Sequence, residues 1–133
     1  MSSFGLSLVL AVIACVIGGV QGGLMLVRPS GAPGQAASAP TEARAVGGLL
    51  FLSHATAALF LGYQPSVGAG MAMALSMAWF GMAMGRGVSG LLDRAEHPFN
   101  AGRFGFELLI AVTLALPFFN PGRLVVLKGA LLA

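Results

Sequence analysis

The stretch FGLSLVLAVIACVIGGVQGGLMLV, residues 4–27, contains no charged residue. As an α-helix it would extend about 36 Å at 1.5 Å per residue, enough to cross the roughly 30 Å hydrocarbon core of a bilayer. A secretory signal is the competing interpretation, because Ala37-Ser38-Ala39 has the small-x-small form of a cleavage site. Three features favour a retained membrane-spanning helix: the run is long, no Lys or Arg precedes it, and Pro40 directly follows that site.

Three further apolar runs follow, and the chain as a whole is strongly apolar. Its mean hydropathy is +0.91 and only 8% of its 133 residues are charged, which lies outside the range of soluble globular domains. We therefore predict one all-α domain, residues 1–133, that forms a transmembrane four-helix bundle surrounded by membrane lipids. The expected helices are 4–27, 43–61, 66–85 and 104–119, with polar loops at 28–42 and 86–103 and an interfacial tail at 120–133.

The charge pattern excludes one class of partner. The formal net charge is +3, but the Lys and Arg residues are dispersed along the chain. Nucleic-acid binding needs a contiguous basic surface, so we expect no nucleic-acid partner. Anionic lipid headgroups are the more natural partners for such residues.

The same basic residues predict an orientation. Those in or beside the two polar loops are Arg28, Arg44, Arg86, Arg94 and Arg103, whereas Arg123 and Lys128 lie towards the C-terminus. The positive-inside rule places loops 28–42 and 86–103 in the cytoplasm and both termini in the periplasm of a bacterial cytoplasmic membrane. The margin between the two sides is small, and the inverted orientation is the alternative.

Glycines at GxxxG spacing occur in the first and third predicted helices. They are Gly18, Gly19, Gly22, Gly23, Gly81 and Gly85. Such pairs let two helix backbones approach closely where lipid provides no hydrophobic drive for association. We predict that these faces pack on other helices, either within this chain or in another protein.

The second predicted helix places a histidine at membrane depth. Thr41 is its expected N-cap and Glu42 lies in its first turn, where a carboxylate is favoured by the helix dipole. His54 lies near the middle of the span, where a polar ring is costly and is by default a functional candidate. The structural alternative is a neutral imidazole hydrogen-bonded to a neighbouring helix.

Most other polar residues gather near loop 86–103. The candidate polar cluster comprises His54, Arg44, Arg86, Asp93, Arg103 and Glu107. Glu107 is expected about one turn inside the last span, where a carboxylate should pair with an arginine or carry a proton. The structural hypothesis is an ion-pair clasp that ties the loop to the bundle. The functional hypothesis is a small pocket that binds a headgroup or substrate, or that relays a proton with His54.

Several of these residues also indicate a family. The run Glu42–Gly48, the segment Arg86-x-x-Ser89-x-x-x-Asp93 and the early glutamate of the last helix occur together. In this respect residues 42–116 resemble the small four-helix bacterial integral membrane proteins known only as a domain of unknown function. The resemblance implies a fold and no particular activity.

Three functions are compatible with the sequence. We favour a non-enzymatic accessory or structural subunit of a larger membrane complex, with transmembrane helices of another protein or of a second copy as partners. The alternative is a binder or carrier of a small apolar or lipid-like molecule, which predicts a cavity between the second and fourth helices faced by His54 and Glu107. An enzyme is the third hypothesis. HExxH, GxSxG and metal-spaced histidines are absent, so we expect no catalytic residue, cofactor or metal.

Overall fold

A computed structural model describes residues 2–29, 39–92 and 99–120, together with residues 122, 128, 129 and 131. The described chain forms helices α1 (Ser3–Val27), α2 (Ala39–Tyr63), α3 (Pro65–Leu92) and α4 (Ala101–Phe119). All of them are long and apolar enough to cross a membrane. The predicted all-α transmembrane four-helix bundle is therefore confirmed. Asp93, parts of both predicted loops and most of the predicted interfacial tail lie outside the described residues.

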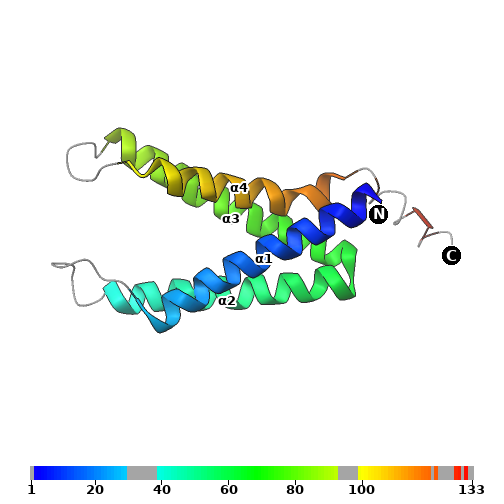
Figure 1. Ribbon diagram of the computed structural model, residues 1–133, viewed down its shortest axis with the longest axis horizontal. Coiled ribbons are helices and arrows are strands. Elements are labelled where there is room, and N and C mark those ends of the chain that lie inside the picture. The colour runs from blue at the N-terminus through cyan, green and yellow to red at the C-terminus, as the bar shows by residue number, and fades with distance from the viewer. Residues whose placement is uncertain are drawn as a thin grey trace.

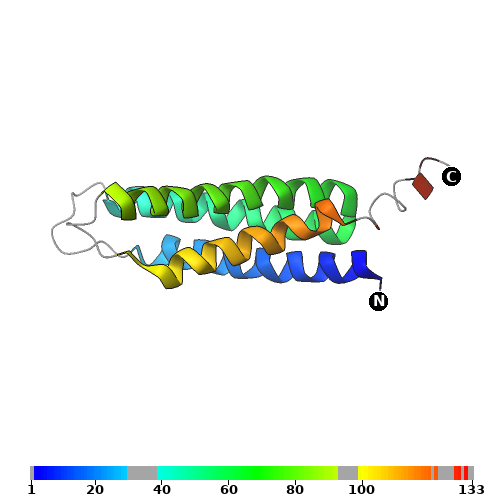
Figure 2. The same ribbon diagram turned by 90° about the horizontal axis from the view of Figure 1, so that it is seen from above.

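The helices run up and down along one axis (Figures 1 and 2). Helix α1 packs most extensively on α2, and α3 on α4, while α2 also contacts α3 and α1 contacts α4. Helices α2 and α4 are thus diagonal to one another. The pairs α1/α2 and α3/α4 lie further apart where α1 ends and α4 begins than at the opposite end (Figure 1).

Helices α2, α3 and α4 are all longer than the sequence indicated. Helix α2 begins at Ala39, so Thr41 lies inside the helix and is not its N-cap, although Glu42 is in the first turn as expected. Pro40 fits there because the first turn of a helix needs no intrahelical N–H donor. Helix α3 continues past Gly85 to Leu92. The prediction that a loop begins at residue 86 is therefore wrong, because residues 86–92 are helical.

Packing of aromatic rings on glycine explains the extension of α3. A Cβ on Gly90 would lie only 2.7 Å from Cδ2 of Phe99, and one on Gly87 would lie 3.6 Å from Cε2 of Phe104. The two rings also contact each other, with centroids 5.5 Å apart. One side of the last turns of α3 therefore packs against Phe99 and Phe104.

Helix α4 begins earlier than predicted because Asn100 caps it. The Asn100 Oδ1 atom accepts a hydrogen bond from the Arg103 backbone N–H at 2.9 Å. The helix contains Pro117 and continues to Phe119. At about 28 Å it matches the hydrocarbon core closely. Its C-terminal end is fastened to α1, because Asn120 Nδ2 donates to the Ser3 carbonyl at 3.1 Å.

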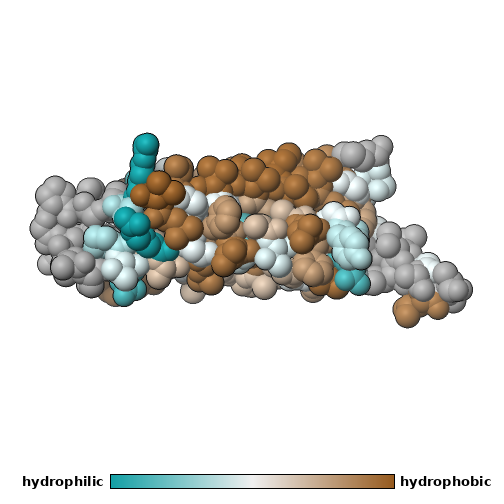
Figure 3. Space-filling model, turned by 90° about the horizontal axis from the view of Figure 1, so that it is seen from below, coloured by the Kyte–Doolittle hydropathy of each residue, from teal (hydrophilic) through white to brown (hydrophobic). Residues whose placement is uncertain are grey.

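Small residues make up much of the core, and many large aliphatic residues lie on the surface. The least exposed core residues include Ala11, Ala57 and Ala72, each 0% exposed, whereas Val20, Leu59 and Val112 are more than half exposed. On the face in Figure 3, apolar residues cover the middle of the molecule and hydrophilic residues gather towards its two ends. This distribution suits a lipid environment, in which small residues let helices approach and large aliphatic side chains face the acyl chains. The chain is an integral membrane protein.

Candidate functional site

The glycines of α1 face α2 of the same chain. A Cβ on Gly22 would lie 2.6 Å from the Phe51 backbone N and 2.7 Å from the Gly47 carbonyl O, and one on Gly18 would collide with the His54 ring. Only a residue without a Cβ permits this approach. Gly18 and Gly22 therefore form the seam between α1 and α2, and their partner is intramolecular.

Gly19 and Gly23 flank this seam on α1 and leave room for a side chain. A Cβ on Gly19 would lie 3.7 Å from Cβ of His54, and one on Gly23 would lie 3.6 Å from Cδ2 of Phe51. These are ordinary van der Waals separations. Gly47 completes the seam from the side of α2, since its own Cβ would lie 2.7 Å from the Gly22 carbonyl O. Sequence reasoning missed Gly47, although the Gly47-Gly48 pair inside an apolar helix was a signal for it.

His54 lies at the centre of the first buried polar site. Its side chain is 0% exposed. Nε2 is 2.9 Å from Nε1 of Trp79, and Nδ1 is 2.7 Å from the Leu50 carbonyl O. Because an indole N–H can only donate, Nε2 must be the unprotonated acceptor, and the proton on Nδ1 is donated to the carbonyl. The ring is thus a neutral tautomer with both nitrogens hydrogen-bonded inside the bundle.

Trp79 joins this site to α4. Its ring meets His54 edge to face at a centroid distance of 5.9 Å and meets Phe106 in the same way at 6.0 Å. It is the chain's single tryptophan and is 1% exposed. The sequence analysis did not select Trp79. The sequence did contain a signal: a single tryptophan lies among Ala and Met residues within a predicted membrane span. A buried indole N–H usually needs an acceptor.

Replacing Trp79 with phenylalanine should destabilise the bundle by about 1–2 kcal/mol, because Nε2 of His54 then lacks a donor in an apolar interior. Phenylalanine keeps most of the ring packing, so the change isolates the hydrogen bond. Thermal unfolding in detergent measures the stability, and the ¹⁵N chemical shifts of the imidazole report the tautomer. An unchanged midpoint together with unchanged shifts would contradict this assignment of the hydrogen bond.

Glu107 forms the second buried polar site. The residue is 1% exposed and pairs with Arg86 on α3. Nη2 of Arg86 is 2.7 Å from Oε1 and Nε is 3.0 Å from Oε2, which makes the pair bidentate. A second bond, from Ser76 Oγ to the Ala111 carbonyl O at 2.6 Å, joins the same two helices. The carboxylate therefore ties α3 to α4.

The remaining members of the predicted polar cluster differ in their roles. Nε of Arg103 is 3.6 Å from Oε1 of Glu107, and its side chain is about half exposed. Arg44 is exposed and makes no ion pair with the described residues. Asp93 lies outside the described residues. The structure thus brings together Arg86, Arg103 and Glu107, and it places His54 in a different interface between α1, α2 and α3.

Gly81 and Gly85 differ from the glycines of α1. A Cβ on either one would meet no heavy atom of the described chain within 4 Å. Both residues are exposed. The face of α3 that carries these two glycines points away from the bundle. No helix of the described part of this chain therefore packs on them, although the sequence predicted such packing.

The fold and the two buried polar sites define a small four-helix integral membrane protein. A family model described as Domain of unknown function (DUF4345) matches residues 3–117. The chain belongs to this family, and the resemblance that the sequence indicated is confirmed. No curated protein and no solved structure matches the chain.

Proposed function

We propose that this protein is a non-enzymatic accessory or structural subunit that packs through α3 against a transmembrane helix of another chain. One observation carries the proposal: the close-contact glycines of α1 are covered by α2, whereas a Cβ on Gly81 or Gly85 would meet no atom of the described residues within 4 Å. A GxxxG pair that has no partner inside its own bundle is available to a helix from outside.

The neighbours of these glycines support the same role. Exposed small residues lie at four-residue spacing along α3, namely the pair Ala74 and Ala78 and the pair Gly81 and Gly85. We call these residues the α3 face. Together they offer about three turns of small-residue surface on which another helix can pack closely.

Support for a non-enzymatic role comes from the two buried polar sites. Both ring nitrogens of His54 are hydrogen-bonded, and both carboxylate oxygens of Glu107 are held by Arg86. A general acid or base must reach a substrate proton. Their geometry instead suits a structural role in holding the bundle together.

The same contacts give little support to the hypothesis of a ligand site shared by His54 and Glu107. That hypothesis predicts one cavity between α2 and α4 faced by both side chains. The two helices are diagonal, and each side chain lies in a separate packed interface.

The α3 face can be tested by mass measurement after extraction in a mild detergent. We expect the wild-type chain to elute in a complex, either with other proteins or with a second copy. The double variant Gly81→Leu, Gly85→Leu should elute as a monomer, because the larger side chains separate the helices. Gly105→Leu on α4 is the matched control, since Gly105 is also exposed with nothing within 4 Å. A monomeric wild-type protein would count decisively against the proposal.

We also propose that the protein lies in a bacterial cytoplasmic membrane with both termini in the periplasm. The support is electrostatic: Arg28, Arg44, Arg86 and Arg103 all lie where α1 and α3 end and where α2 and α4 begin.

Cysteine labelling of intact spheroplasts tests this orientation. We expect an impermeant thiol reagent to label Gln64→Cys, between α2 and α3, but to label Thr41→Cys only after lysis. Both native residues are exposed. The unmodified protein, in which Cys15 is buried, is the control for background labelling. The reverse labelling pattern would invert the topology.

A further inference from the structure

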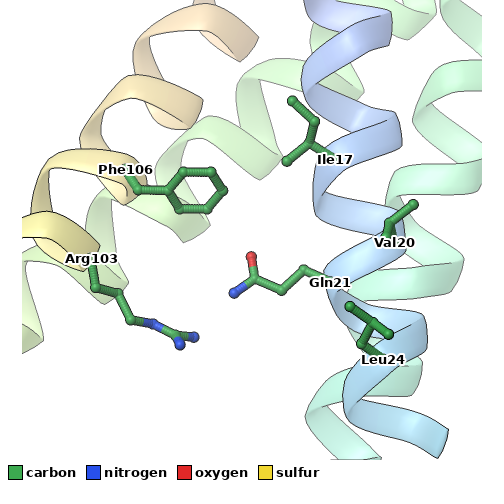
Figure 4. A pocket seen from close by; sticks show the side chains of 6 residues that line it. All are labelled: Ile17, Val20, Gln21, Leu24, Arg103 and Phe106. Atoms are coloured by element: carbon green, nitrogen blue, oxygen red, sulfur yellow. The ribbon is translucent and has the colours of Figure 1, made fainter.

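An open groove separates α1 from α4 at the arginine-rich end of the bundle. It has a volume of about 340 Å³ and is lined by Ile17, Val20, Gln21, Leu24, Arg103 and Phe106 (Figure 4). A second hollow of about 320 Å³ shares Gln21, Leu24 and Arg103 with the first and adds Arg28. The two hollows are therefore adjacent.

The groove is amphipathic along its length. Ile17, Val20 and Phe106 form an apolar wall at one end. Further along the groove, Gln21 on α1 and Arg103 on α4 lie opposite each other, and Leu24 lies beyond Gln21 (Figure 4). An occupant that matches these walls has an apolar chain and a polar head.

The residues that line the two hollows include Arg28 and Arg103 and no acidic side chain. Both oxygens of Glu107 are held by Arg86, so Arg103 has only one contact to that carboxylate, at 3.6 Å. The first turn of α4, where the helix dipole favours an anion, contains no acidic residue. Arg28 adds a further positive charge to the adjoining hollow. The charge that would complement this end is negative.

Hydrogen bonding at Gln21 is also incomplete. Its Oε1 atom is buried and has no hydrogen-bond partner among the described residues. Its amide nitrogen is directed towards the guanidinium of Arg103 (Figure 4). Both of those groups are donors, so an acceptor fits between them, while Oε1 needs a donor.

We propose that this groove binds one anionic glycerophospholipid with a hydroxyl-bearing head, of the phosphatidylglycerol type. An acyl chain lies along Ile17, Val20 and Phe106, and the phosphodiester oxygens accept hydrogen bonds from Gln21 and Arg103. A head-group hydroxyl donates to Oε1 of Gln21. The inference is independent of the α3 face, because the groove lies between α1 and α4.

Native mass spectrometry of the protein in mild detergent, with equal amounts of phosphatidylglycerol and phosphatidylcholine, tests the site. We expect the wild type to retain one phosphatidylglycerol in preference to phosphatidylcholine. Arg103→Gln should weaken this retention about tenfold or more, because it removes a charge-assisted contact. Arg44→Gln is the matched control: it removes one charge from the same end of the bundle, and Arg44 lines neither hollow.

Ile17→Trp provides a second variant that leaves the arginines intact. Ile17 is half exposed, so a larger side chain fills the groove without entering the core. We expect it to abolish the preference for phosphatidylglycerol while the helical content by circular dichroism stays at the wild-type level. Equal retention of the two lipids by the wild type would overturn the proposal. So would retention by Arg103→Gln equal to that by Arg44→Gln, or by Ile17→Trp equal to wild type.

Discussion

Replacing Gly22 with alanine is expected to push α1 away from α2 and to lower the free energy of unfolding by about 2–3 kcal/mol, in the upper range for overpacking. The added Cβ would lie 2.6 Å from the Phe51 backbone N and 2.7 Å from the Gly47 carbonyl O. Backbone atoms of a neighbouring helix cannot rotate aside as a side chain can. The whole helix has to move, and the contacts along the seam weaken together.

Gly23→Ala is the matched control on the same helix. Its Cβ would lie 3.6 Å from Cδ2 of Phe51, which is ordinary contact. Alanine is also the better helix former, so we expect a change within about 0.5 kcal/mol of the wild type or a small gain. Denaturant unfolding in micelles compares the two variants. Equal stabilities would show that the seam is not closely packed at Gly22.

The second large effect is expected from Arg86→Met, at about 3 kcal/mol of destabilisation, because it leaves the buried carboxylate of Glu107 without its partner. Glu107 is 1% exposed and would lose contacts at 2.7 and 3.0 Å. Arg103 cannot replace them from 3.6 Å with a half-exposed side chain. Exposed ion pairs of that kind contribute less than about 1 kcal/mol.

The double variant Arg86→Met, Glu107→Leu should recover most of that loss, because replacing both charges with apolar groups of similar size is often nearly neutral. The same unfolding experiment measures it alongside the single variant. Additive destabilisation in the double variant would mean that Arg86 and Glu107 do not act as a pair.

The membrane-spanning helices could be predicted from the sequence because hydropathy is a local property. The run 4–27 has no charge, and the segment 62–66 interrupts the next two runs. The helix ends were less accurate, since they depend on contacts that are distant in sequence. The extension of α3 to Leu92, for example, depends on the packing of Phe99 on Gly90.

For the candidate site, too, the sequence predicts the local features and not the contacts between distant residues. His54 and Glu107 could be predicted as candidates, because a polar side chain inside an apolar run is visible in the sequence. Their partners depend on which helices are adjacent and at what register. The sequence grouped both residues in one cluster, but α2 and α4 are diagonal and Trp79 lies between His54 and the residues of α4. Nothing local to His54 indicates Trp79 as its donor.

The polar contacts have a clear role in a bundle with so small a core. Alanines and glycines bury little area, and lipid provides no hydrophobic drive between helices. The bond from Trp79 to His54 joins α3 to α2, and the pair of Arg86 with Glu107 joins α3 to α4. Helix α3 is thus fixed on its inner side, while its outer face is free to pack on another protein.

Site-specific photo-crosslinking in native membranes tests the role of that outer face most directly. A photoreactive amino acid at Gly85 is expected to form a discrete product with the mass of this chain plus a partner, whereas the same residue at Gly105 on α4 should form none. Crosslinking at Gly85 to lipid alone, or equal protein products at both positions, would contradict the proposal that this protein acts by helix packing through α3.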